Sequence, residues 1–169
     1  MKKIIFVFIP FLLCLFLSLG CTSSIDEPSD DNYGEIAVGN EGIIATIFMT
    51  NDNGDDLVNK NVLVKNLDEN SLLEELKDCN IVVKETNLIN FNTYTTDDDL
   101  NVGVANFSKE FYDFNLGSSY ESMMLNSVAK TYMDNFKLDK FKILVDGNEY
   151  QSGHILFNEN DYFTLDSLK

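Results

Sequence analysis

The chain has 169 residues, 44% of them hydrophobic, and its 28 acidic residues against 12 lysines give a net charge of −16. Such a field repels nucleic acid and anionic lipid head groups, which argues against a nucleic-acid-binding protein. The 149 residues after position 20 suit one domain with a single hydrophobic core.

Residues 1–20 have the order of a lipoprotein signal peptide. Lys2 and Lys3 precede an apolar run from Ile4 to Leu19, and a cysteine follows at position 21. The run Ser18-Leu19-Gly20-Cys21 resembles a lipobox, in which the cysteine thiol is joined to diacylglycerol and becomes the first mature residue. We therefore predict lipidation at Cys21.

Two features of this segment bear on that prediction. Ser18 departs from the lipobox pattern, because leucine usually stands three residues before the cysteine. The alternative is an uncleaved membrane helix, but an apolar run of sixteen residues interrupted by Pro10 is short for a span of about 20. Both alternatives leave the rest of the chain outside the cytoplasm, and we expect a protein anchored by lipid to the extracytoplasmic face of the cell membrane.

Residues 21–40 are predicted to be a flexible acidic linker, since they combine serine, proline and glycine with five acids and have little to bury. A linker of this kind spans about 25 Å on average and would hold the domain, residues 41–169, near the membrane. With Cys14 in the signal and Cys21 carrying lipid, Cys79 has no disulfide partner and is expected to be a partly buried small hydrophobe.

The first half of the domain begins with a continuous β-prone run at 43–49, typical of a central strand buried on both faces. A second short strand is predicted at 61–65, after a polar turn. An amphipathic helix of about ten residues follows, carrying Leu72, Leu73 and Leu76 behind two acids. Residues 81–83 fit either a small strand or an extended connector.

In the second half, the alternating segments 88–94 and 100–104 predict two strands joined by a hairpin turn at Asp97–Asp99. Ser118-Ser119-Tyr120-Glu121 has the pattern of a capping box and would begin a helix to about Asn135. A strand at 141–145 would end in a turn at Asp146-Gly147. This order predicts a single compact α+β domain, with about four to five strands in one sheet and two helices packed on one face.

From about Ile43 to Phe163 the chain resembles the GerMN domain of spore-germination and sporulation lipoproteins. Three matches in the right order carry the resemblance: a Leu-Leu-rich helix at 72–77, the run Val102–Phe111 ending a strand near Phe107-Ser108, and Leu144-Val145-Asp146-Gly147 followed by Gly153-His154-Ile155. Asn106 and Leu156 depart from the family by standing where aspartate is common, and Asn101 stands near where the family often has a turn glycine. The loss of the two acids argues against metal-ligand or catalytic roles for Asn106 and Leu156.

The resemblance implies a compact unit similar to ring-building motifs, which pack side by side in cell-envelope complexes and have no attributed enzymatic chemistry. The partners it implies are extracytoplasmic parts of membrane proteins or envelope complexes, with side-by-side self-association as a further option. The residues agree, since no metalloprotease, nucleophile-elbow, P-loop or dinucleotide pattern is present. We expect an assembly module in sporulation or spore germination, without catalytic residues, cofactor or metal.

Three weaker hypotheses were weighed beside this one. Ser108, His154 and an aspartate could form a hydrolytic triad, although Ser108 also suits a cap and His154 a glycine loop. The acids and amides at 51–56 could bind calcium, but Asp56 and Val62 stand where a calcium loop needs glycine and glutamate, which favours a solvated turn. A binder of a small molecule or cell-wall fragment would use the aromatic residues Tyr112, Phe114 and Tyr120.

Overall fold

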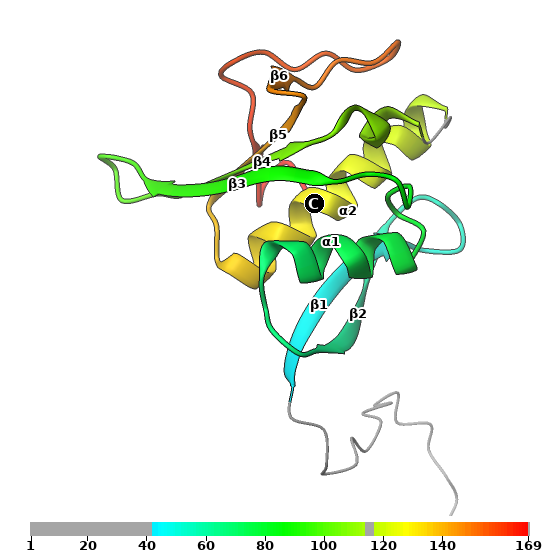
Figure 1. Ribbon diagram of the computed structural model, residues 1–169. Helices are drawn as coiled ribbons and strands as arrows, with labels where there is room; N and C mark the ends of the chain where they lie inside the picture. Colours follow the sequence, from blue (N-terminus) through cyan, green and yellow to red (C-terminus); the bar gives the residue numbers. More distant parts are fainter. Residues whose placement is uncertain (1–41, 114–116, 169) are drawn as a thin grey trace, which may run out of the picture. The chain divides into compact units, whose positions relative to one another are not determined.

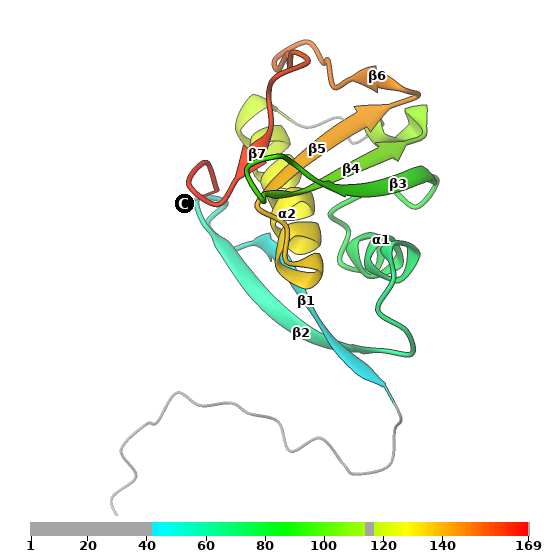
Figure 2. The same cartoon turned by 90° about the vertical axis from the view of Figure 1, so that its left-hand side faces the viewer.

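The computed structural model describes residues 42–113 and 117–168, which belong to a compact unit spanning Gly39–Lys169. Two helices lie between a two-stranded sheet and a five-stranded sheet (Figure 1, Figure 2). The predicted signal peptide, Cys21 and the whole of the predicted linker lie outside the described residues. No helix in the described part has the length and apolar character needed to cross a membrane.

The smaller sheet is an antiparallel hairpin of β1 (Ile43–Thr50) and β2 (Leu57–Val64). Ala45 and Ile47 face the core, whereas Ile44 on the opposite face is 52% exposed. The prediction of a central strand buried on both faces is therefore wrong. β1 pairs with β2 along one edge, and the two helices contact the strand on the face that carries Ala45 and Ile47.

The larger sheet has the order β3 (Leu88–Thr95), β4 (Asn101–Phe107), β5 (Lys140–Val145) and β6 (Asn148–Glu149), with β7 (Phe163–Thr164) also pairing with β5. β4 and β5 are parallel, and the other pairs are antiparallel. Both predicted turns are confirmed. Asp99 has a φ of 59°, and Asp146 and Gly147 have φ values of 49° and 78°, which suit a tight hairpin turn.

The two predicted helices are confirmed as α1 (Glu69–Asp78) and α2 (Ser118–Phe136), with a short 3₁₀ turn, η1 (Lys109–Tyr112), before α2. Asp68 caps α1, and its Oδ1 accepts a hydrogen bond of 2.8 Å from the Ser71 amide. The capping box is wrong, because α2 begins after Gly117 without a side-chain cap and the Glu121 carboxylate is buried. Residues 81–83 form no strand, because residues 81 and 82 lie in a bend of the segment that connects α1 to β3.

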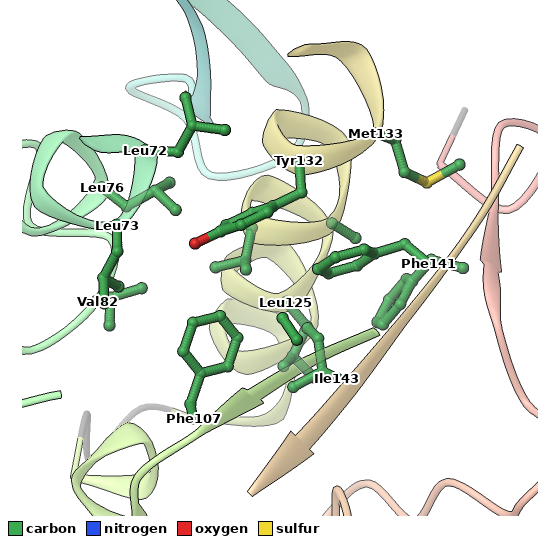
Figure 3. Close-up of a cluster of buried hydrophobic side chains, with 14 of the residues drawn as sticks. Leu72, Leu73, Leu76, Val82, Phe107, Leu125, Tyr132, Met133, Phe141 and Ile143 are labelled. Carbon is green, nitrogen blue, oxygen red and sulfur yellow. The ribbon is translucent and has the colours of Figure 1, made fainter. Parts of the chain in front are cut away.

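Tyr132 of α2 lies at the centre of the core, between the leucines of α1 and the aromatic rings of the larger sheet (Figure 3). Its ring stacks on Phe141 at 5.3 Å, and its hydroxyl donates a hydrogen bond of 2.8 Å to the Glu69 carbonyl. Burial raises the pKa of this phenol, and the hydrogen bond satisfies its buried hydroxyl. One core therefore joins both helices to the sheet.

The α+β fold is confirmed, with both helices on the same face of the larger sheet. Within residues 42–113 and 117–168 the chain forms seven strands in two sheets, rather than four to five in one. The difference arises because the β1–β2 hairpin lies across the helices from the larger sheet, and because β6 and β7 are only two residues long.

Candidate functional site

A pocket of about 290 Å³ lies between α2, the β5–β6 hairpin and the segment that follows residue 154. Its walls are mostly apolar and its remaining lining is polar or acidic. The apolar lining residues are Leu125, Ile143, Ile155, Phe157, Tyr162 and Phe163; the others are Ser122, Asn126, Glu149, Asp161 and Ser167.

The pocket forms where strand pairing along β5 is interrupted. β6 pairs with Leu144 and Val145, and β7 pairs with Lys140 and Phe141 on the same side of β5. The described strands therefore leave the middle of that edge, next to Ile143, without a partner strand. The chain between β6 and β7 loops away from the sheet before it returns (Figure 2).

The Lys142 side chain of β5 contacts β6 and the segment between β6 and β7. Its side chain is only 7% exposed, and its ammonium forms an ion pair of 3.0 Å with Glu149 Oε1. The same ammonium donates to the Glu159 carbonyl and lies 4.6 Å from the centre of the Tyr162 ring. Since a buried charge is stable only when its partners surround it, this lysine fixes the pocket's acidic wall in place.

Two carboxylates contribute to the pocket lining. Glu149 uses one oxygen for Lys142, while its Oε2 is buried and has no hydrogen-bond partner in the described part of the chain. Asp161 accepts hydrogen bonds from the Asn158 amide and side chain at 2.7 and 2.9 Å, and these bonds lower its pKa. The pocket thus combines apolar walls with an ionised acid.

A buried carboxylate–phenol pair lies next to this region. The Tyr150 hydroxyl donates a hydrogen bond of 2.7 Å to Glu121 Oε1, and the Glu121 residue is only 3% exposed. Burial, and then this bond, raise the pKa of Tyr150. The pair joins the residue after β6 to the first turn of α2.

Comparison with known proteins places the chain in a family. Residues 46–151 match the profile of the Germane family, whose description is "Sporulation and spore germination". The chain belongs to the Germane family. The resemblance seen in the sequence is thereby confirmed, and the matched range ends before six of the residues that line the pocket.

Two similar solved structures come from the sporulation protein GerM of Bacillus subtilis. Its first GerMN domain is 20% identical, covers 73% of this chain and 98% of its own, and gives a TM-score of 0.52. Its tandem GerMN domains are 16% identical, cover 72% of this chain and give a TM-score of 0.51. The chain spans 46% of the tandem structure's length, and at these identities the likeness concerns the fold. None of the curated proteins matches this chain.

Ser108 and His154 take part in separate hydrogen-bonded contacts. Ser108 precedes η1 without capping it, and its Oγ instead accepts a hydrogen bond of 3.0 Å from the Asn87 amide. His154 is exposed in a turn held by the Ser152 hydroxyl. No hydrogen bond joins Ser108 to His154 in the described part of the chain, so the geometry gives the triad hypothesis no support.

The acids and amides at 51–56 form a turn in which polar groups hydrogen-bond to one another. Asn51 Oδ1 accepts hydrogen bonds from the amides of Asp55 and Asp56 at 3.1 and 3.4 Å, and its amide group donates to Asp55. Across residues 42–113 and 117–168, no group of three or more histidine, cysteine or acidic side chains is placed to hold a metal ion.

Two of the three aromatic residues considered for small-molecule binding, Tyr112 and Tyr120, do not line the pocket. Tyr112 packs on Tyr150 with ring centres 5.2 Å apart, and Tyr120 lies exposed beside Gly54. Phe114 lies outside the described residues. Sequence reasoning missed the pocket, although the dense apolar and acidic residues at 155–168 were a signal that this segment packs against the domain.

Proposed function

We propose that this Germane-family protein is a lipid-anchored assembly module of the cell envelope, which acts in sporulation or spore germination by docking on other proteins. The observation that carries the proposal is the match of residues 46–151 to a family described by those two processes. The fold shared with the GerMN domains of a sporulation protein supports it.

Anchoring is proposed from the lipobox at 18–21, with 21–40 as the linker and 41–169 as the domain. Cleavage would remove two of the twelve lysines and none of the acids, which leaves ten lysines against 28 acids and a mature net charge of −18. A domain of that charge, held at the extracytoplasmic face, favours partners with basic surfaces.

Docking rather than catalysis is supported by the distribution of polar groups. The candidate nucleophile Ser108 serves local backbone contacts, whereas the larger sheet and the hairpin leave apolar side chains such as Ile44 and Ile89 about half exposed. Such exposed aliphatic side chains are available for contact with other proteins.

A second candidate function is binding of a small molecule or cell-wall fragment, which the 290 Å³ pocket favours. It predicts a rise in melting temperature of the domain with a soluble wall fragment, without any requirement for the lipid anchor.

The anchoring proposal is tested by Cys21→Ser, with Cys79→Ser as the matched control. We expect Cys21→Ser to release the protein or to accumulate as uncleaved precursor, since only the cysteine thiol can accept the lipid. Cys79→Ser, which changes the free cysteine of the domain, should remain processed and membrane-bound. Normal processing and membrane retention of Cys21→Ser would refute the lipobox.

A further inference from the structure

We infer that the pocket beside the unpaired edge of β5 is a docking site for a segment of a partner protein that inserts an apolar side chain flanked by lysine or arginine. This inference rests on the proposed docking function and names the surface and the chemistry of the partner. Figure 2 shows the region, between the C-terminal strand β7 and the β5–β6 hairpin.

The size and lining of the pocket suit one large side chain. Leu125 and Ile143 are each 1% exposed and form fixed walls from a helix and a strand. A volume of about 290 Å³ is at the lower end for sites that hold whole drug-sized ligands. The pocket therefore fits an anchoring side chain better than an extended ligand.

The surface around the pocket favours a protein rather than a free small molecule. Leu156 and Leu165 are 62% and 58% exposed, and they belong to the same segments that supply the outer wall of the pocket. A small amine that filled the pocket would leave both leucines in water, whereas a polypeptide segment can cover the pocket and its surroundings together.

The charges around the pocket favour a basic partner. Asp161 is ionised, Glu149 has a buried oxygen without a partner in the described residues, and Lys142 is already committed to Glu149, Glu159 and Tyr162. Lysine or arginine beside the anchoring side chain would meet the exposed Asp161 carboxylate, and an acidic segment would be repelled by it and by the net charge of −16.

The test uses peptide fluorescence, because the protein contains no tryptophan. The probe is the capped peptide Lys-Trp-Leu-Lys, compared with Glu-Trp-Leu-Glu and with tryptamine, a single amine that carries the same indole. The protein is the chain from residue 22, which keeps the whole compact unit Gly39–Lys169. We expect a blue shift of the tryptophan emission with the basic peptide and at least tenfold weaker binding of the acidic peptide.

The location is tested by Ser122→Phe, which places a ring into the pocket from an exposed position of α2. Ser119→Phe, which is exposed on the same helix and does not line the pocket, is the matched control. We expect Ser122→Phe to weaken binding of the basic peptide at least tenfold and Ser119→Phe to leave it unchanged. Asp161→Asn should weaken binding several-fold at low salt and less at high salt.

Three outcomes would overturn the inference: no binding of the basic peptide, equal binding to Ser122→Phe, or tryptamine binding as tightly as the peptide. The last outcome would identify a site for small cationic ligands. Failure of the inference is distinguishable from failure of the proposed function. If the anchored Ser122→Phe variant captures an envelope partner as well as wild type does, the docking function holds and the assignment of the pocket as the docking site is wrong. If the peptides bind but no partner is captured, the pocket is a peptide-binding site and the proposed docking function is wrong.

Discussion

Asn106 shows how a polar side chain in the larger sheet can have a structural role. Its Oδ1 accepts a hydrogen bond of 2.8 Å from the Gly147 amide. The residue is largely buried and joins β4 to the turn between β5 and β6. An acceptor at this position is therefore explained by the turn, without a ligand or a catalytic role.

We predict that Asn106→Ala lowers the free energy of unfolding by about 1–3 kcal/mol, because it leaves the Gly147 amide without its acceptor. Asn106→Asp keeps an acceptor and should cost less. Urea unfolding of both variants, with the exposed Asn92→Ala as control, measures the difference. Equal loss in Asn106→Ala and Asn92→Ala would show that the bond is not significant.

Asp68 is expected to contribute to the stability of the folded protein in a pH-dependent way. The hydrogen bond from the Ser71 amide holds the pKa of Asp68 below 3.8, its usual value. Because the folded-state pKa is lowered, the stabilisation is complete above 3.8 and is lost as pH falls through the folded-state pKa. We expect Asp68→Ala to lower the melting temperature by a few degrees at neutral pH and to converge with wild type in acid. Asp68→Asn, which caps without titrating, should lack this pH dependence; a constant gap between wild type and Asp68→Ala at every pH would contradict the prediction.

Side chains of α2 form hydrogen bonds with the edge of β1 that has no neighbouring strand among the described residues. Asn135 Oδ1 accepts from the Thr46 amide at 3.0 Å, and its amide group donates to the Thr46 carbonyl at 2.7 Å, as a neighbouring strand would. Thr131 Oγ1 accepts from the Phe48 amide at 3.0 Å. These contacts hold the hairpin to the helix and block that edge from pairing with another chain.

We predict that Asn135→Ala lowers the free energy of unfolding by about 1–3 kcal/mol and speeds hydrogen exchange at the Thr46 amide. The Phe48 amide should be affected less, since Thr131 remains. Asp134→Ala, at the preceding position of the helix, is the control. Unchanged exchange at Thr46 in Asn135→Ala would mean that the edge is held by other contacts.

α2 and β5 contribute side chains to one shared core. Val128 is fully buried, so Val128→Asp would place a carboxylate in an apolar contact at a cost of several kcal/mol. We expect loss of cooperative thermal unfolding, with Ser119→Asp on the exposed face as control. Native-like melting of Val128→Asp would contradict the placement of Val128 in the core.

Helical periodicity and turn residues predicted most elements correctly. Leu72, Leu73 and Leu76 share one face of α1, and Asp146-Gly147 has the backbone conformation of its turn. The run at 43–49 was misinterpreted, because continuous apolar sequence does not reveal which faces a tertiary neighbour covers. The predicted capping box does not form, because the Glu121 carboxylate accepts a hydrogen bond from the distant Tyr150 hydroxyl instead.

At the scale of the whole molecule, the pocket could not be predicted from local pattern. Its walls come from positions between Ser122 and Ser167 and meet only after β5 has paired with β6 and β7. The two-residue strand at Phe163 carries no periodic signal of its own. Family resemblance did not help either, since the matched range ends at residue 151.

Under the proposed lipid anchoring, charge and tether together would determine how the domain meets a partner. A strongly acidic domain is repelled from an anionic membrane surface over a screening length of about 8 Å at physiological salt, so it should stand off the lipid. A partner with a basic surface, anchored in the same membrane, would then be bound at a raised effective concentration. Weak contacts suffice under these conditions.

Crosslinking yield between the protein and its envelope partner in intact cells tests this account most directly. The yield should fall sharply for Cys21→Ser, which lacks the anchor, and for wild type at raised salt, while Cys79→Ser should match wild type. If the unanchored protein binds its partner as well as the anchored one and salt has no effect, tethered electrostatic docking is contradicted.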